Sequence, residues 1–294
     1  MSTAAIDNKV QMVVSNIRNL PTPPIVFNQI QKAINDPNVS AAQIASILSE
    51  DPAMSVKVLK LTNSAFYGLS REVDSVKQAV VIIGLEAVKN LVLSASVLDM
   101  FKGKHIDQEY QERFWRHSLA TGICARLIAR RIQTRGMVDP DTAFSSGLLH
   151  DVGKMVLSCH LPKEHKAFTE ARATDPATMD WELENKVLGF NHAQVGGFLA
   201  TTWNLPEKLA NSITYHHVPT EQGLSDPITS FIHLANHIAK ETFRDDADSG
   251  PLGELNPEVM AYLQVDDAKV VELSELLREE YVKAETFMQM AGLA

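Results

Sequence analysis

The chain has few cysteines: Cys124 and Cys159 are the only two among its 294 residues. Two cysteines cannot build the disulfide framework of a small secreted domain, and Cys124 lies in an apolar run where a thiol serves as a small buried hydrophobe. The first ten residues, MSTAAIDNKV, contain no apolar core of the kind that a signal peptide needs. These features predict a cytoplasmic protein that works in a reducing compartment.

Long hydrophobic runs are also missing. The most apolar stretch, Ala79–Leu98, is interrupted by Glu86, Lys89 and Asn90, so it predicts a pair of core helices and no membrane span. The sequence contains no glycine-rich phosphate loop and no Ser-His-Asp or Cys-His arrangement that would support nucleophilic catalysis. It also shows no internal repeat.

An excess of positive charge is missing as well, and the formal net charge is −9. Residues 1–104 carry 10 Lys/Arg and 8 Asp/Glu, a balance of +2, whereas residues 105–294 carry 17 and 28, a balance of −11. An acidic surface binds nucleic acid poorly, because that affinity comes mainly from neutralising phosphates. Short helices in residues 1–104 could suggest a DNA-binding helix-turn-helix motif, but this segment has no basic recognition face. The charge pattern predicts no nucleic-acid partner and is compatible with metal or protein binding.

Alternating strand patterns are absent, and apolar residues recur at helical spacing along almost the whole chain. Ser40-Ala41-Ala42-Gln43 is a capping-box pattern, and Asp51-Pro52 provides an N-cap followed by proline in the first turn. The sequence therefore predicts an all-α protein. The expected helices cover residues 6–17, 25–34, 40–48, 51–62, 75–84, 85–101, 114–131, 143–157, 164–173, 182–188, 192–203, 207–215, 228–243, 267–281 and 283–290, with a loop at 244–257.

Histidine is absent from the first 104 residues, and all ten histidines follow. Five of them lie on separate helical segments with an aspartate among them: His117, the pair His150-Asp151, His192 and the adjacent His216-His217. A cation that takes imidazole and carboxylate ligands must collect them from several elements at once, and a buried aspartate is rare unless it is paired or ligating. A single helical histidine is more often an ordinary polar residue. The combined order favours a metal site, and a hydrogen-bonded polar core with ordered water is the alternative.

The motifs around these residues resemble those of the HD superfamily of metal-dependent phosphohydrolases, and more closely its HDOD branch. The HD pattern of a His, a His-Asp pair and a distal Asp corresponds to His117 in WRHS, His150-Asp151 in LLHDVGK and Asn236 in HLANHIA. His192 in NHAQVGG and His216-His217 in YHH resemble the additional metal-ligating histidines of HD-GYP phosphodiesterases. The segments LPTPP, EDPAMSVKVLKLTNSAFYG and AVVIIGLEAVKNLVL resemble the helical part specific to HDOD proteins.

This resemblance implies a set of site residues. Asp151 and Lys154 would be the catalytic residues, with Lys154 meeting an anion bound to the cation, and the metal would be a divalent Fe, Mn, Ni or Zn. The implied metal ligands are His117, His150, Asp151, His192, His216, His217 and Asn236.

Two departures from the pattern bear on activity. Asn236 stands where the distal Asp is expected, unless His233 or His237 takes that place, and an amide oxygen brings no charge to a metal. Val218-Pro219-Thr220 replaces the Gly-Tyr-Pro signature, which argues against hydrolysis of cyclic di-guanylate by the HD-GYP route.

The resemblance also implies an architecture: a multi-helix HD-like bundle at 105–294, an N-terminal HDOD-type helical subdomain at 1–104, and one HDOD domain over about 20–220. It implies a bacterial-type signal-transduction protein that acts through protein–protein interaction and retains an HD-type metal site. Cyclic-dinucleotide enzymes and response regulators are candidate partners, and a homodimer is a candidate assembly. The alternative is a metal-dependent phosphohydrolase that cleaves phosphomonoesters, phosphodiesters or nucleotides.

Overall fold

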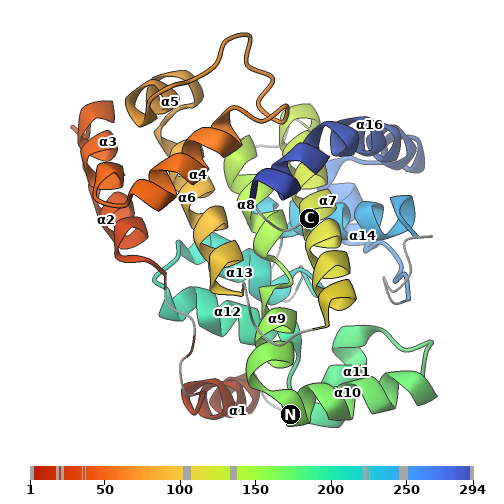
Figure 1. The fold of residues 1–294 in the computed structure, drawn as a ribbon. Helices are drawn as coiled ribbons and strands as arrows, with labels where there is room; N and C mark the ends of the chain where they lie inside the picture. The colour runs from red at the N-terminus through yellow and green to blue at the C-terminus, as the bar shows by residue number, and fades with distance from the viewer. Residues whose placement is uncertain are drawn as a thin grey trace. The chain divides into compact units, whose positions relative to one another are not determined.

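A computed structural model of the chain describes residues 3–17, 20, 23–34, 36, 38–101, 107–132, 138–220, 224, 226–244 and 251–291. Over these residues the chain forms sixteen α-helices and no strand (Figure 1). The predicted all-α class is therefore confirmed. Of the loop predicted at 244–257, residues 245–250 lie outside the described residues, and residues 251–256 belong to no helix.

The chain divides into two compact units. The first unit consists of Met1–Leu20 and Lys104–Leu277, and the second consists of Pro21–Gly103 and Arg278–Ala294. The N-terminal helix α1 (Thr3–Ser15) thus belongs with the histidine-bearing part of the sequence, and the last helix, α16 (Asp267–Ala291), contributes to both units.

The second unit is built on a nearly all-buried helix, α6 (Leu85–Met100), against which α2, α4 and α5 pack. The predicted caps of this unit are present: Ser40 and Gln43 form a capping box before α3, and the Asp51 side chain accepts from the Met54 amide before α4. Within the described residues no single helix is long and apolar enough to cross a membrane, and only the pair α5–α6, bent by 119°, reaches that length and composition together. The remaining helices are α2 (Ile25–Ile34), α3 (Ala41–Ser49), α4 (Pro52–Thr62) and α5 (Val76–Ile83).

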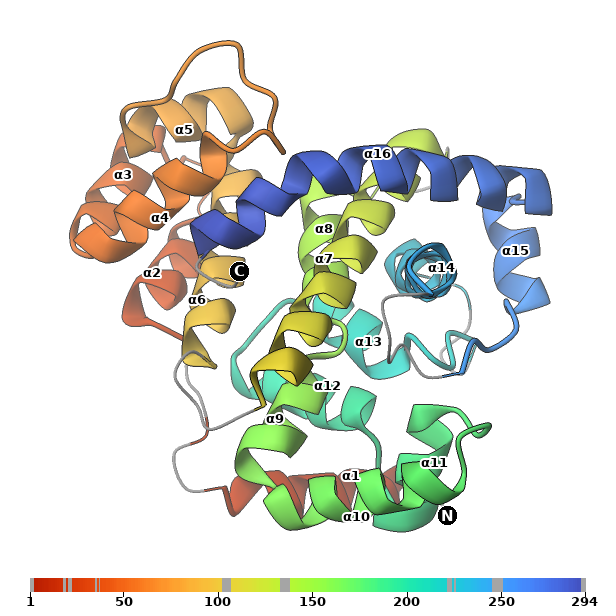
Figure 2. The ribbon, with the colours of Figure 1, turned by 45° about the vertical axis from the view of Figure 1, so that its right-hand side comes forward.

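The first unit carries all the described histidines, and its long helix α7 (Gln108–Arg131) packs against both α8 and α14. Figure 2 shows α14 end-on between α7 and α15. The other helices of this unit are α8 (Pro140–Leu149), α9 (Val152–His160), α10 (Pro162–Thr174), α11 (Asp180–Leu188), α12 (His192–Thr202), α13 (Glu207–Tyr215), α14 (Pro227–Thr242) and α15 (Pro257–Leu263).

Three details of this unit differ from the sequence-based prediction. The helix expected at 143–157 is two helices, because the chain leaves the helical path at His150-Asp151. α15 was not predicted: it begins at Pro257, the last residue of the loop expected at 244–257, with Asn256 as its N-cap. The helices expected at 267–281 and 283–290 are one continuous helix, since no helix-breaking residue separates them.

Candidate metal centre

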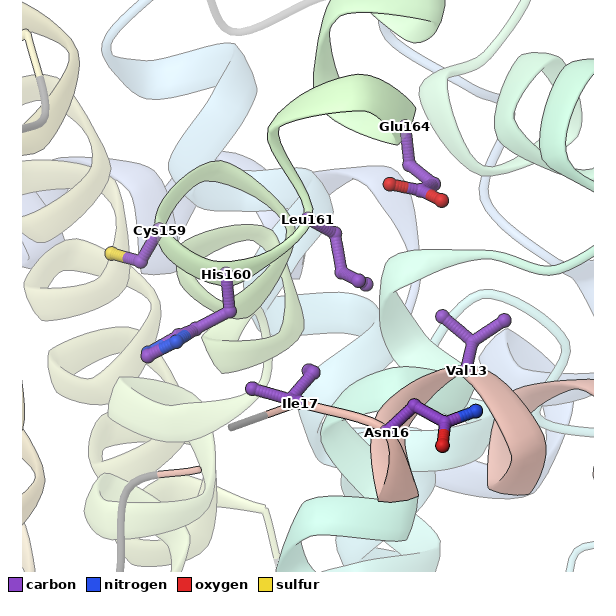
Figure 3. Close-up of a pocket in the computed structure, with 7 residues that line it drawn as sticks. All are labelled: Val13, Asn16, Ile17, Cys159, His160, Leu161 and Glu164. Atoms are coloured by element: carbon purple, nitrogen blue, oxygen red, sulfur yellow. The ribbon is translucent and has the colours of Figure 1, made fainter. Parts of the chain in front are cut away.

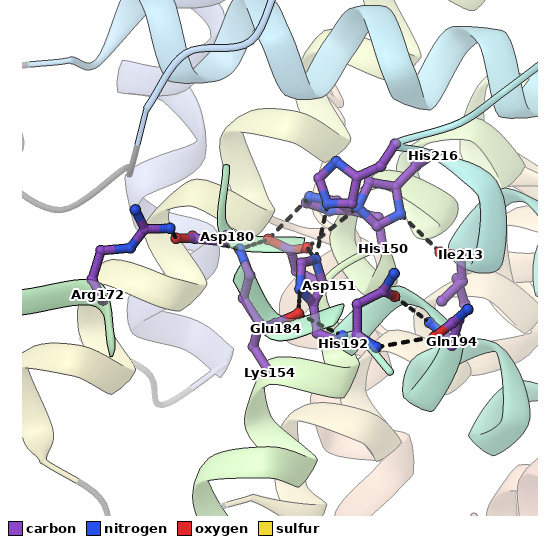
Figure 4. A network of polar contacts seen from close by, with 12 residues as sticks. His150, Asp151, Lys154, Arg172, Asp180, Glu184, His192, Gln194, Ile213 and His216 are labelled. Carbon is purple, nitrogen blue, oxygen red and sulfur yellow. Dashed lines mark hydrogen bonds and ion pairs between the residues drawn. The ribbon is translucent and has the colours of Figure 1, made fainter. Parts of the chain in front are cut away.

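Six of the seven sequence-predicted ligands come together from four places in the first unit. His117 lies in the middle of α7, His150 and Asp151 form the junction between α8 and α9, and His192 is the first residue of α12. His216 ends α13, and His217 follows it. Their side chains form two groups that share Asp151. Figure 4 shows His150, Asp151, His192 and His216 close together.

Glycines allow the helices to approach closely enough for this meeting. A Cβ atom on Gly147 of α8 would lie 2.7 Å from the Cα of Gly122 on α7. A Cβ atom on Gly153 of α9 would lie 1.9 Å from the backbone oxygen of His192 on α12. Both distances are far below a van der Waals contact, so the two crossings require glycine. They bring the His150-Asp151 junction beside α7 on one side and α12 on the other.

Asp151 is the shared centre of the cluster and is only 1% exposed. Its Oδ2 lies 3.3 Å from His150 Nε2 and 3.8 Å from His117 Nε2. Its Oδ1 lies 3.1 Å from His192 Nε2 and 3.5 Å from His216 Nε2. An aspartate at a helix N-terminus normally accepts a hydrogen bond from the first turn, but the Asp151 side chain makes no such cap and faces the imidazoles.

Two of the imidazoles are oriented by backbone carbonyls. His150 Nδ1 lies 2.7 Å from the Gly147 oxygen, and His216 Nδ1 lies 2.8 Å from the Ile213 oxygen. A carbonyl only accepts, so each Nδ1 carries a proton, and in the neutral ring Nε2 is then the nitrogen with the lone pair. This is the orientation of metal-binding histidines, in which the nitrogen remote from the metal donates to a protein oxygen.

His192 is oriented by a carboxylate. Its Nδ1 donates to Glu184 Oε2 at 2.6 Å, and the same oxygen accepts from the His192 backbone nitrogen at 2.7 Å. His192 Nε2 then faces Asp151 and also lies 3.0 Å from His217 Nε2. A carboxylate behind an imidazole makes it a stronger metal ligand.

The atoms at the centre lack protein partners, and this fits a cation. The Nε2 atoms of His117, His150 and His216 and the Oδ1 atom of Asp151 are buried and make no hydrogen bond with any described residue. Two groups of atoms lie close enough to ligate: one from Asp151, His192, His216 and His217, the other from His117, His150 and Asp151, with ligand atoms in each group within 4.8 Å of one another. Imidazole with one carboxylate is a donor set for divalent transition metals.

Three ion pairs link Asp151 of this cluster to Lys154, Asp180 and Arg172. Lys154 Nζ donates to Asp151 Oδ2 at 2.7 Å and lies 4.0 Å from Asp180, while Arg172 is paired with Asp180 from the other side. Burial opposes ionisation of Asp151, but His150, Lys154 and His192 hold its pKa well below the ordinary value. Asp151 is therefore a carboxylate at any physiological pH.

Burial keeps most of the imidazoles neutral. It lowers the pKa of His117 and His217 well below the usual range, with help from neighbouring imidazoles, and it lowers the pKa of His216 to about 3. His192 is different: burial alone would lower its pKa, but the Glu184 carboxylate, with Asp151, raises it above the ordinary value. Since a metal binds only unprotonated imidazole, three of these side chains are ready to ligate at neutral pH.

Asn236, which the sequence predicts in place of the distal HD aspartate, is a buried amide. Asn236 on α14 is 7% exposed, and its Oδ1 makes no hydrogen bond with a described residue. His233 does not replace it, because its Nδ1 lies 2.8 Å from the His216 oxygen and its Nε2 accepts from the Asn256 amide. His237 lies 3.9 Å from Glu241 and belongs to neither ligand group.

Several residues of the site escaped the sequence analysis. Asp180 and Glu184 are spaced four residues apart on α11, so both face the cluster, and Trp181 stacks on His217 with ring centroids 5.8 Å apart. The available signal was the spacing of Asp180 and Glu184, which lie twelve and eight residues before His192. Lys240, one turn after Asn236 on α14, is a further buried charge near the cluster.

A separate hollow of about 550 Å³ lies beside α1 and shares no residue with the metal cluster (Figure 3). Cys159 and His160 are among its lining residues, and the Cys159 thiol points away from the Glu164 carboxylate. Its lining residues are Val13, Asn16, Ile17, Cys159, His160, Leu161 and Glu164.

Three solved structures share this fold. An HDOD domain protein of unknown function from Geobacter sulfurreducens has a TM-score of 0.79 and 24% identity, covering 98% of this chain and 100% of that one. A protein from Marinobacter aquaeolei VT8 with a proposed role in signal transduction has a TM-score of 0.78 and 21% identity, covering 99% and 66%. A proposed phosphohydrolase from Shewanella amazonensis SB2B has a TM-score of 0.73 and 22% identity, covering 97% of each chain.

The chain is also similar in sequence to one curated protein and to one family model. An uncharacterized protein of Treponema pallidum (strain Nichols) is 29% identical over 230 residues, which are 76% of this chain. The aligned part spans only 43% of that relative, so the chain matches less than half of its length. The family model for the HDOD domain matches residues 20–219. The chain therefore belongs to the HDOD domain family.

Proposed function

We propose that this HDOD protein is a signal-transduction regulator that holds a divalent transition metal at its HD-type centre and acts through contact with other proteins. The observation that carries the proposal is the set of buried, unbonded Nε2 atoms around Asp151. Buried polar atoms without partners are costly, and a bound cation would satisfy several of them at once.

The metal would be Fe, Mn, Ni or Zn, because mixed imidazole and carboxylate ligation suits these ions better than Mg or Ca. Asn236 would contribute at most a neutral oxygen, so this centre would bind a divalent ion less tightly than one with a second carboxylate. The residues that would hold it are His117, His150, Asp151, His192, His216 and His217, with Asn236 as a further ligand.

Two features favour regulation over turnover. Asp151 is the only carboxylate in the two ligand groups found among the described residues. Lys154, the residue suited to meeting a substrate anion, is already paired with Asp151 at 2.7 Å. The signal-transduction role proposed for the Marinobacter aquaeolei protein supports the same direction.

The second unit would provide the protein-binding surface. Among its described residues it exposes five large apolar side chains: Ile25 (78% exposed), Val56 (51%), Val81 (70%), Ile82 (46%) and Val282 (68%). Val81 and Ile82 are adjacent on α5. Exposed apolar groups of this kind are compatible with partner binding. Cyclic-dinucleotide enzymes, response regulators or a second copy of the chain are the candidate partners.

A second candidate function is metal-dependent phosphohydrolysis. It is favoured by the position of Asp151 in both ligand groups, because imidazoles lie near each of its two carboxylate oxygens. A bound metal would polarise a phosphoryl oxygen and make water a better nucleophile. Lys154 would stabilise negative charge that develops on the phosphate, and Glu184 would keep His192 oriented.

Metal analysis of the purified chain, combined with phosphatase and phosphodiesterase assays in added Mn²⁺ or Ni²⁺, tests both candidates. The regulatory proposal expects metal that is lost in His150→Ala and Asp151→Ala, kept in the control His237→Ala, and accompanied by no turnover. Turnover that disappears in the first two variants and persists in the control would establish the hydrolase instead. Absence of bound metal under all conditions would sink both.

A further inference from the structure

His233 on α14 joins one of the candidate metal ligands to a segment outside the centre. Its Nδ1 lies 2.8 Å from the backbone oxygen of His216, and its Nε2 lies 3.3 Å from the backbone nitrogen of Asn256. A carbonyl only accepts and an amide N–H only donates, so the ring is a neutral imidazole that carries its proton on Nδ1. His233 belongs to neither ligand group, so it reaches the centre through the backbone of His216.

Both ends of this link are helix termini. His216 is the C-cap of α13, and the last carbonyls of a helix have no partner within that helix. The His216 carbonyl accepts from His233 instead. Asn256 is the N-cap of α15, and its side chain accepts from the Glu258 amide at 2.9 Å. The imidazole of His233 therefore fixes the end of α13, where His216 and His217 lie, relative to the start of α15.

The segment that leads into α15 also contacts α11. A Cβ atom on Gly253 would lie 3.1 Å from Met179 Cε, and Met179 is the N-cap of α11. α11 carries Trp181, which stacks on the ring of His217. Residues 251–256 thus contact two helices that border the centre, α14 and α11, and Figure 2 shows this segment running below α14 and into α15.

We propose that His233 is a positioning residue of the metal centre and couples metal binding at His216 and His217 to the docking of residues 251–256 and the start of α15. The inference rests on the proposed metal centre and adds its regulation. A metal needs His216 held in place, and the docked segment holds it through His233. Metal binding and docking therefore stabilise each other by the same factor, which is about 5- to 150-fold between coupled sites.

This coupling gives the centre a route along the chain to the second unit. α15 is followed by α16, whose residues from Arg278 onward belong to that unit. The exposed apolar side chains proposed above to contact a partner lie in the same unit. Metal-dependent docking at the start of α15 would therefore act on the covalent connection to the proposed partner-binding surface.

Hydrogen–deuterium exchange of the full chain, measured by mass spectrometry with saturating Mn²⁺ and with a chelator, tests the coupling. In the wild type, Mn²⁺ slows exchange of the amides in 252–263 by about 5- to 10-fold. His233→Asn places an amide near the position of Nδ1 and does not reach Asn256, whereas His233→Gln places one near Nε2 and does not engage His216. Each variant breaks one end of the link, so in each the slowing by Mn²⁺ falls below about 2-fold.

The matched control is His165→Asn, because His165 is also half-buried in the first unit but contacts Tyr110. This variant retains the slowing seen in the wild type. A merely structural role of His233 would have a different signature: exchange at 252–263 would speed up by the same factor with and without Mn²⁺, and the slowing by Mn²⁺ would not change.

Unchanged slowing by Mn²⁺ in either folded His233 variant overturns the coupling, and so does Mn²⁺ binding to the wild type without slowing. Calorimetry separates these results from failure of the centre: a wild type that binds none of Mn²⁺, Fe²⁺, Ni²⁺ and Zn²⁺ overturns the metal centre and the coupling with it. Circular dichroism verifies the fold. If neither variant folds, Asn256→Pro replaces them with the same expected result, because it removes the donating N–H at a φ of −67° that proline adopts.

Discussion

Glu184 accepts two hydrogen bonds from His192, one from the backbone nitrogen at 2.7 Å and one from the ring Nδ1 at 2.6 Å. The pair fixes both the start of α12 and the direction of the imidazole. Glu184 is 1% exposed and belongs to neither ligand group, so it acts on the centre only through His192. Substitutions at Glu184 therefore test how the orientation of His192 affects metal binding without removing a ligand.

Glu184→Gln is expected to weaken Mn²⁺ binding by about 10- to 100-fold, because a neutral amide holds the ring less firmly and makes it a poorer ligand. The free energy of unfolding of the metal-free protein should fall by about 1–3 kcal/mol. Calorimetry and urea denaturation measure the two effects. Glu182→Gln, an exposed position on the same helix, should change neither, and unchanged metal affinity in Glu184→Gln would remove Glu184 from the site.

Asp151→Asn is expected to abolish measurable Mn²⁺ binding, because the only carboxylate common to both ligand groups is lost. The variant also leaves Lys154 without its contact partner, so the metal-free protein should lose about 3–5 kcal/mol of stability. Asp141→Asn is the matched control: it breaks the pair of Asp141 with Arg126 and destabilises the protein but should keep metal affinity. Retained metal binding in Asp151→Asn would contradict the centre described above.

The clustering of six candidate ligands could be predicted from the sequence, because their order resembles the HD pattern and they lie in apolar helical segments where polar residues need a reason. The acidic residues that support the ligands could not be predicted in this way. Glu184 and Asp180 lie in an acidic half of the chain, where an acid on a helix is usually solvated, and only the packing of α11 shows that Glu184 is buried. Lys240 likewise looks like an ordinary last-turn cation of a helix.

The break between α8 and α9 could not be predicted either. The segment LLHDVGK contains no proline, and its apolar spacing continues through the break. Asp151 leaves the helical path, with φ −98° and ψ 9°, and its carboxylate lies among imidazoles from other helices. Local helix propensity does not depend on such tertiary contacts, so it could not predict the break. The Ser40 and Asp51 caps depend only on neighbouring residues, and they were predicted correctly.

The stability of the metal-free protein should fall as the pH drops from about 7 to 5. His117, His216 and His217 have lowered pKa values in the folded state, so only the unfolded chain takes up their protons in this range. Each such proton reduces the free energy of unfolding by about 1.4 kcal/mol per pH unit below the unfolded pKa of about 6.5. His192, whose pKa is raised, has the opposite sign, and its contribution is lost only as the pH rises above 6.5.

Urea denaturation in the presence of a chelator, repeated across this range, measures the slope. His216→Gln removes one of the three groups and should reduce the slope by about one proton. A stability that stays flat between pH 7 and pH 5 would show that the imidazoles are not held neutral by burial.

Gly153→Ala should damage the centre without touching a ligand. The new Cβ atom would lie 1.9 Å from the His192 oxygen and 2.8 Å from the Gly196 nitrogen, both of which are backbone atoms that cannot rotate away. α9 and α12 must therefore separate, which moves His192 away from Asp151. We expect a loss of about 1–3 kcal/mol in the free energy of unfolding, together with weaker Mn²⁺ binding. Gly253→Ala is the control, since its nearest neighbour is the mobile end of Met179 at 3.1 Å. Equal metal affinity in the two variants would mean that the close crossing of α9 and α12 does not set the geometry of the centre.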